Sequence, residues 1–465
     1  MKLKIKQVDI PPADPFQNDV LNRKESAEIL TQLISSLDEP SVIAIDAPWG
    51  FGKTTFMRMF RQYLISQGFN TLYFNAWEND FVVDALASLI GEIEAGLDDL
   101  ILARGQKSTI KRKVTQLKRI ASYLGRKSAP VAIRLLTAGI VDTEEIYEQA
   151  IKDISETIAR EQIENYEKAK RNFSNFKDKL SEFVKTLGEN NNRPIAFFID
   201  ELDRCRPNYA VEILEKAKHL FSVNGFVFVI AIDKKQISHS IRSIYGQGMD
   251  VDGYLRRFID FDYRLPISDN REFAKFLFNQ YEYANYFSNR SAEDNSYASD
   301  VIIDMFAELS ILFGFSLRVQ EQCFGLLTVT LLTSAKNEKI HPHLLVFLLM
   351  LKNVNLPLYE RYVENLAEAY EIFDFLRELP GGSHFLNEHL GSILEAYIVA
   401  GRNIKQEISK FKENNRSILN SQSADDITKE RANSVLSFIE DLRYREKINH
   451  VSKIAKKIDI SDRFI

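Results

Sequence analysis

Two short stretches of the sequence contain the residue types that handle phosphate groups in proteins. The first, APWGFGKTT, places Gly50 and Gly52 directly before Lys53 and Thr54. Glycines let backbone N–H groups turn toward an anion without a Cβ in the way. The lysine ammonium then reaches the β- and γ-phosphates, and the threonine hydroxyl binds Mg²⁺. The order predicts a phosphate-binding loop made of Pro48, Trp49, Gly50, Phe51, Gly52, Lys53, Thr54 and Thr55.

This loop departs from the usual pattern at one position, since Ala47 stands where a glycine is usual. The missing glycine affects the tightness of the first bend more than the binding of phosphate. A glycine turn that merely precedes a helix is the alternative interpretation. The helical pattern FMRMFRQYLISQG that follows would add the partial positive charge of its N-terminus in either case.

The second stretch, RPIAFFIDELDR, is an apolar run that ends in Asp200 and Glu201. An aspartate at a strand tip is placed to hold Mg²⁺ through its water shell. The glutamate beside it would polarise the water that attacks the γ-phosphate. A buried strand that ends in a solvated acidic turn is the alternative. Because both parts occur in the expected order, we interpret them as one site of nucleotide hydrolysis, with Thr54 and Asp200 on the metal.

The elements that must position these residues read as parallel strands. The segments 41–47, 71–77, 194–200 and 225–233 are mostly continuous in apolar character, as buried parallel strands are. With helices between them they predict a three-layer α/β fold with its ligand at the carboxyl ends of the strands. Asp233 stands at one such end, where it either senses the γ-phosphate or caps the next helix.

The residues APWGFGKTTF, FNAWEND, FFIDELDRCRP, FVFVIAIDKKQI and YLRRFIDFDYRLP together resemble the KAP family of P-loop NTPases. The resemblance covers about residues 10–270. It implies an architecture similar to that of the AAA+ and STAND classes, with an extra strand between the phosphate-binding and magnesium strands. Many KAP proteins carry two transmembrane helices between these motifs, and this chain does not. The resemblance permits a role in antiviral defence, beside a protein effector encoded nearby.

The resemblance also implies roles for residues outside the two motifs. Arg256 and Arg257 occupy the position of the arginine finger in AAA+ relatives, which a neighbouring subunit of a homo-oligomer would deliver. The alternative interpretation is that Arg256 and Arg257 are a basic pair on the surface without this role. Arg318 matches the second sensor of a helical lid. Asp19 and Arg23 are expected near the base or its covering loop.

The sequence predicts four parts: an NTPase core at 1–79 and 191–266, a helical insertion at 80–190, a helical lid at 267–354 and a C-terminal helical domain at 355–465. Residues 104–127 of the insertion carry nine basic residues and no acid. Such a run either binds nucleic acid or forms the solvated face of a packed helix. The tail shows no catalytic cluster, and His384, His389 and His450 lack metal-ligand spacing.

Composition limits the class of protein. The 465 residues are 45% hydrophobic and 27% charged, and the net charge of −5 argues against a chain-wide grip on nucleic acid. Cys205 and Cys323 read as reduced thiols, and no apolar run is long enough to cross a bilayer, so we expect a cytoplasmic protein. A Mg²⁺-dependent ATPase is the leading function, since no guanine-reading motif follows a strand. A slow nucleotide switch that binds a partner is the alternative.

Overall fold

The computed structural model describes residues 1–2, 8–81, 85–104, 115, 170–185, 193–266, 269–288, 292–335, 339–445 and 450–461. The chain divides into two compact units. We call Val8–Pro266 the sheet unit, and Met1–Gln7 with Ile267–Ile465 the helical unit.

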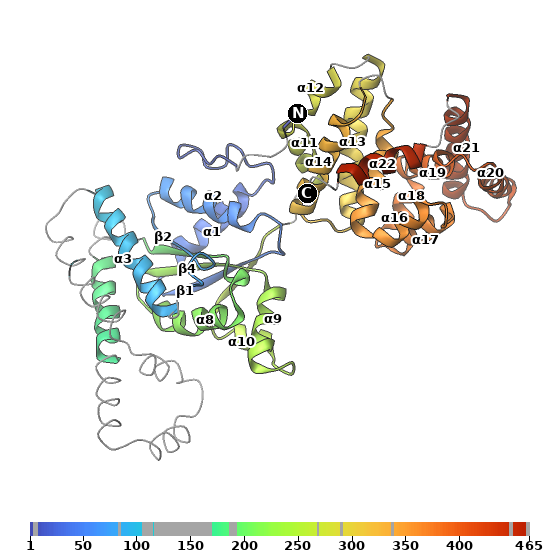
Figure 1. Cartoon of the computed structure of the whole chain (residues 1–465). Coiled ribbons are helices and arrows are strands. Elements are labelled where there is room, and N and C mark those ends of the chain that lie inside the picture. Colours follow the sequence, from blue (N-terminus) through green and yellow to red (C-terminus); the bar gives the residue numbers. More distant parts are fainter. Residues whose placement is uncertain are drawn as a thin grey trace. The chain divides into compact units, whose positions relative to one another are not determined.

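The sheet unit alternates strands and helices along the chain (Figure 1). Its elements are α1 Lys24–Ser36, β1 Ser41–Asp46, α2 Lys53–Ser66, β2 Asn70–Asn75, α3 Ala85–Arg104, β3 Ile195–Asp200, a 3₁₀ turn Leu202–Arg204, α8 Pro207–Phe221, β4 Phe226–Ile232, α9 Lys234–Tyr245, α10 Val251–Leu255 and β5 Phe261–Arg264. A further helical segment covers residues 170–185.

The five strands form one parallel sheet in the order β2-β3-β4-β1-β5. The parallel α/β fold predicted from the sequence is therefore confirmed, and β4 is the extra strand between β1 and β3. The sequence did not reveal β5. This edge strand pairs with β1, and its residues Phe261, Asp262 and Arg264 are exposed, so it lacks the continuous apolar run of the four predicted strands.

Alternate residues of β1, β2, β3 and β4 serve two separate cores, one on each face of the sheet. Ile43 and Ile45 of β1 pack with α1 and α2, against Phe56 and Phe60. Val42 and Ala44 face the other side, where α3, α8, α9 and α10 cover the sheet. Figure 1 shows α1 and α2 on one side of the strands and α8, α9 and α10 on the other. This gives the three layers.

The two ends of the predicted insertion belong to the core of the sheet unit. Leu89 and Ile93 of α3 and Leu180 and Phe183 of the segment 170–185 are buried in the same cluster as strand residues. Except for Arg104 and Thr115, the basic stretch 104–127 lies outside the described residues. Its proposed binding of nucleic acid stays a prediction.

The helical unit contains only helices among its described residues. They are α11 Asn270–Gln280, α12 Tyr283–Ser288, α13 Ala292–Leu312, α14 Leu317–Leu332, α15 Pro342–Val354, α16 Leu356–Val363, α17 Ala369–Glu378, α18 Gly382–Asn387, α19 His389–Gly401, α20 Lys405–Asn420, α21 Asp426–Arg445 and α22 His450–Ser461. α15 lies at its centre, with every side chain from Pro342 to Leu351 buried. In the described part of the chain, no helix combines the length and the apolar character that a membrane span requires.

Four histidines at the starts of α15, α19 and α22 gather in the helical unit, together with Tyr397 from the interior of α19. The rings of His341 and His450 lie 4.2 Å apart, and His343 stacks on Tyr397 at 5.2 Å. His343 is 1% exposed, and no described residue accepts or donates a hydrogen bond at its Nδ1. Burial, with the neighbouring His389 and His341, lowers the pKa of His343 from 6.5 to about 4.

This histidine makes the free energy of unfolding depend on pH. Between pH 6.5 and about 4 the unfolded chain binds a proton that the folded unit excludes, so stability is lost as the pH falls through this window. Each pH unit is worth about 1.4 kcal/mol, so the total loss is roughly 3 kcal/mol. His343→Phe keeps a ring beside Tyr397 and should flatten the curve. Urea unfolding of both proteins from pH 7.5 to 4.5 measures the difference, and parallel curves would contradict it.

Candidate functional site

The predicted phosphate loop and Asp200, the residue predicted to hold the metal, lie at the same edge of the sheet, where the parallel strands end. β1 ends at Asp46 and leads into the loop, β3 ends at Asp200, and β4 ends at Ile232, just before Asp233. Since the strands are parallel, all three ends share one edge. The topology thus brings together residues that are 146 or more positions apart in the sequence.

The loop adopts the backbone conformation that its glycines were predicted to allow. Gly50 and Gly52 have φ of 80° and 76°, in the left-handed region that favours glycine. Gly52 is the N-cap of α2, and Phe56 N donates to its carbonyl at 3.0 Å. Among the described residues, no acceptor takes the backbone N–H of Gly52, Lys53 or Thr54. These donors at a helix start are suited to an anion.

Arg23 holds the loop from its outer side. Its guanidinium donates from Nη1 to Gly52 O at 3.1 Å and from Nη2 to Phe51 O at 2.6 Å. The side chain is 2% exposed, and burial lowers its pKa to about 10, against the raising effect of Asp19. Arg23 therefore remains charged at neutral pH. Because it binds the outward carbonyls, it fixes the orientation in which the N–H groups point inward.

Replacing Arg23 by alanine should loosen the loop. Hydrogen bonds to a charged group contribute about 1.5–3 kcal/mol each, so two lost bonds should lower the free energy of unfolding by several kcal/mol. Arg23→Lys is the matched control, because one ammonium keeps the charge but cannot reproduce the planar fork. Denaturant unfolding and calorimetric titration with ATP measure the effects. If both variants bind ATP as the wild type does, Arg23 does not shape the loop.

Lys53 starts α2 and turns its ammonium back toward the loop. Nζ donates to Ala47 O at 2.6 Å and lies 3.3 Å from Asp203 Oδ2. Lys53 and Asp203 are 9% and 2% exposed. Sequence reasoning missed Asp203, although it stands only three residues after Asp200. A buried acid beside a strand tip was the available signal, and the acidic turn ELDR obscured it because solvated turns share that composition.

Asp200 and Thr54 face each other, as the metal prediction requires. Thr54 Oγ1 lies 3.4 Å from Asp200 Oδ1, and Tyr73 of β2 donates its hydroxyl to Asp200 Oδ2 at 2.8 Å. Burial raises the pKa of Asp200, while the bonds from Tyr73 and from the backbone N–H of Glu201 lower it. Sequence reasoning also missed Tyr73, whose ring reads as part of an apolar strand.

Glu201 occupies a strained position at the tip of β3. Its φ of 60° lies in the left-handed region, which a residue with a Cβ seldom adopts. Its Oε1 lies 3.4 Å from Thr54 Oγ1 and 2.8 Å from Arg204 Nη1. Arg204 therefore forms an ion pair with Glu201. The turn at Glu201 directs its carboxylate toward the start of α2.

Asp233 caps a helix, as one of the two predictions expected, and it also makes a second contact that was not predicted. Its Oδ1 accepts from Lys235 N and Gln236 N, at 3.0 and 3.2 Å, so it caps α9. Its Oδ2 accepts from Trp49 N in the phosphate loop at 2.9 Å. The residue thus ties the end of β4 to the loop, and a role in sensing the γ-phosphate stays a prediction.

The structure does not bring Arg256 and Arg257 to the loop of their own chain. Arg256 and Arg257 are exposed and precede β5, whose entry residue Asp260 bonds to Val42 at the amino end of β1. They therefore lie at the opposite edge of the sheet from the loop. Arg318 is exposed in the first turn of α14, in the helical unit. The proposed roles of all three stay predictions.

The residues at the sheet edge fit a magnesium–nucleotide complex. Asp200 is 1% exposed and has no cationic partner among the described residues, so a divalent cation would balance a buried negative charge. No group of three or more acidic, cysteine or histidine side chains in the described part could hold a metal. Mg²⁺ keeps waters and binds through one or two protein ligands plus phosphates, and Thr54 and Asp200 could serve as those ligands.

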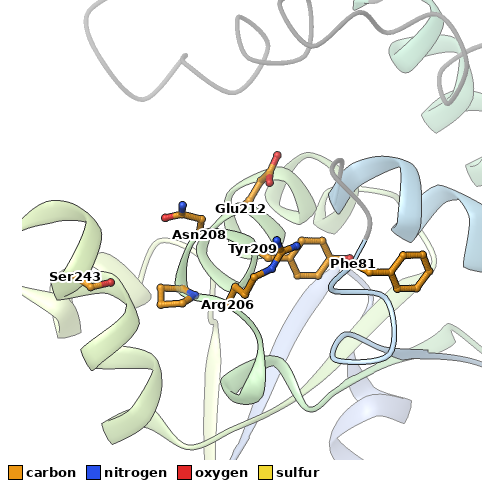
Figure 2. A pocket seen from close by; sticks show the side chains of 7 residues that line it. Phe81, Arg206, Asn208, Tyr209, Glu212 and Ser243 are labelled. Atoms are coloured by element: carbon orange, nitrogen blue, oxygen red, sulfur yellow. The ribbon is translucent and has the colours of Figure 1, made fainter.

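A cavity of about 410 Å³ lies near this edge but is lined by other residues (Figure 2). Its lining comprises Phe81, Arg206, Pro207, Asn208, Tyr209, Glu212 and Ser243. Arg206 is held by Asp80, whose Oδ1 accepts from Nε at 2.9 Å. The pair joins the segment after β2 to the start of α8. Since Asp80 is the last residue of the motif FNAWEND, this motif has a structural role beside the site.

Comparison with known proteins agrees with this geometry. The family described as KAP family P-loop domain matches residues 23–418, which is well over half the chain. No curated protein matches the sequence.

Two solved structures of the ORC2 protein of Aeropyrum pernix align with the chain at low similarity. The structure described as ADPNP-ADP complexes has 15% identity and a TM-score of 0.32, over 94% of this chain and 97% of that one. The ADP form has 14% identity and a TM-score of 0.28, over 76% and 77%. A likeness at this level says nothing about what this chain binds. The family match, found over a sheet with the phosphate loop at its edge, identifies the chain as a member of the KAP family of P-loop NTPases.

Proposed function

We propose that this KAP-family chain is a Mg²⁺-dependent ATPase. The observation that carries the proposal is the convergence of Thr54, Asp200 and Glu201, whose oxygens approach within 3.4 Å at the start of α2. Lys53 and the N–H groups of the loop would hold the phosphates. Thr54 and Asp200 would hold Mg²⁺, which supplies charge neutralisation of the phosphate oxygens.

Each residue of this set has a chemical task that its position supports. Glu201 acts as the general base that orients and polarises a water for attack, and its pairing with Arg204 keeps the carboxylate in place. Tyr73 orients Asp200 through the bond to Oδ2. ATP is preferred over GTP because the segment after β4 reads Asp233-Lys234-Lys235 and lacks a guanine-reading motif.

The exposed pair Arg256 and Arg257 fits delivery to a second copy of the chain, because it lies at the edge opposite its own loop. We propose that ATP and Mg²⁺ promote this assembly, which would place a guanidinium against the developing charge on the γ-phosphate. A protein effector and a role in antiviral defence remain proposals from the family resemblance, and adjacent effector genes would support them.

The test of the function is phosphate release by the purified full chain. We expect turnover of ATP with Mg²⁺, little turnover of GTP, and none after chelation with EDTA. Particle size with and without ATP and Mg²⁺ should be measured in the same samples. Tight ATP retention with negligible turnover, even in the assembled form, would instead favour a nucleotide switch. Failure to bind ATP at all would refute the proposal.

A further inference from the structure

One carboxylate oxygen connects three parts of the site. Asp203 Oδ2 accepts from Trp49 Nε1 in the loop and from Asp233 N after β4, each at 2.8 Å. The same oxygen lies 3.3 Å from Lys53 Nζ. Asp233 returns to the loop through its bond from Trp49 N. Asp203 is therefore the hub of a closed set of contacts among the loop, α2 and β4.

The contact with Lys53 is the weakest of the three by geometry. A carboxylate oxygen offers about two lone-pair sites, and the two 2.8 Å bonds fill them. The lysine at 3.3 Å is thus held chiefly by charge. Phosphate oxygens compete for the same ammonium. When Lys53 turns toward them, Asp203 becomes a buried anion without a cationic partner among the described residues, which is costly.

We propose that Asp203 is a latch that sets nucleotide affinity by competing with the phosphates for Lys53. This inference rests on the proposed function, because it requires that the loop binds ATP. Asp203 acts through Lys53 and Trp49 and does not itself touch the nucleotide. The competition weakens ATP binding and favours nucleotide release. Trp49 reports the state of the latch, because its indole shares the oxygen that Lys53 leaves.

The first measurement is ATP affinity by calorimetry for the full-length wild type and Asp203→Asn. The asparagine oxygen can still accept from Trp49 and Asp233, while the charge that attracts Lys53 is gone. We expect the dissociation constant to fall at least roughly tenfold, because no buried anion is left behind on binding. Unchanged or weaker binding by a folded Asp203→Asn would overturn the latch.

Asp46→Asn is the matched control for the loss of one negative charge. Asp46 ends β1 beside the loop, accepts from Lys234 N at 3.1 Å and makes no bond to Lys53 in the described structure. If both variants bind ATP more tightly than the wild type and to the same degree, the gain comes from the loss of a negative charge in general. That result would contradict the latch. A gain confined to Asp203→Asn supports the latch.

The second measurement uses the small number of tryptophans. The chain has two, so Trp77→Phe leaves Trp49 as the sole tryptophan. ATP should shift the emission of Trp49 in this background, and the shift should shrink when Asp203→Asn is added. An identical shift in both backgrounds would contradict the latch. Wild-type protein that binds no ATP would refute the proposed function itself, whereas wild-type binding with no effect of Asp203→Asn refutes only the latch.

Discussion

Lys53→Ala should abolish detectable ATP binding. The ammonium is buried against the first carbonyls of the loop, whereas the Arg23 guanidinium binds the outward carbonyls at the loop's end. Its charge-assisted bonds to two phosphate groups would contribute about 1.5–3 kcal/mol each, so affinity should fall by roughly 100-fold or more. Calorimetric titration with ATP and Mg²⁺ measures the loss.

The folded state of the variant needs its own measurement, since Lys53 also neutralises Asp203. Asp203 keeps two N–H donors after the substitution, from Trp49 and Asp233, but it becomes a buried anion without its cation, so we expect a clear loss of stability with a cooperative thermal transition. Lys53→Arg keeps the positive charge but changes the shape of the side chain, so it separates the two contributions to ATP binding. ATP affinity equal to that of the wild type in a folded Lys53→Ala protein would remove the basis of the phosphate site.

Glu201→Gln should bind ATP but release phosphate at least about 10²-fold more slowly. A positioned general base typically contributes 10²–10⁴-fold to a rate, and the amide cannot accept the proton of the attacking water. The amide retains the size of the side chain and its oxygen near Thr54. Single-turnover phosphate release, with binding measured in parallel, separates the two steps. Full turnover by this variant would refute the role of Glu201 as the base.

The left-handed backbone at Glu201 provides a second, independent variant. Glu201→Gly removes the carboxylate and suits a φ of 60°, where a side chain with a Cβ costs about 1–2 kcal/mol. We expect this protein to be no less stable than the wild type and as inactive as Glu201→Gln. An unstable glycine variant would mean that the ion pair with Arg204 outweighs the strain.

The inner part of the fold was predictable because its signals are continuous. β1, β3 and β4 are buried along nearly their whole length, so each produces an unbroken apolar run. β5 pairs with β1 at the edge of the sheet, most of its side chains are exposed, and it produces no such run. The order of phosphate loop and acidic strand tip likewise fixed the candidate site, since parallel strands bring their ends to one edge.

The contacts of the supporting residues could not be predicted, although Arg23 was expected near the site, because their partners are far away in the chain. Arg23 precedes the loop carbonyls it binds by 28 and 29 positions, and Tyr73 precedes Asp200 by 127. Neither has a local spacing that reveals the contact. Asp233 was predicted as a cap or a sensor, but its second bond, to Trp49, depends on the packing of β4 against β1.

The close packing of α3 on β2 places this helix against a strand that contributes Tyr73 to the site. A Cβ placed on Gly96 of α3 would lie 2.4 Å from Leu72 Cδ2, so helix and strand touch with no room for a side chain between them. Leu72 adjoins Tyr73, whose hydroxyl holds Asp200. Two consecutive residues of β2 thus connect the packing of α3 with the hydrogen bond that orients Asp200.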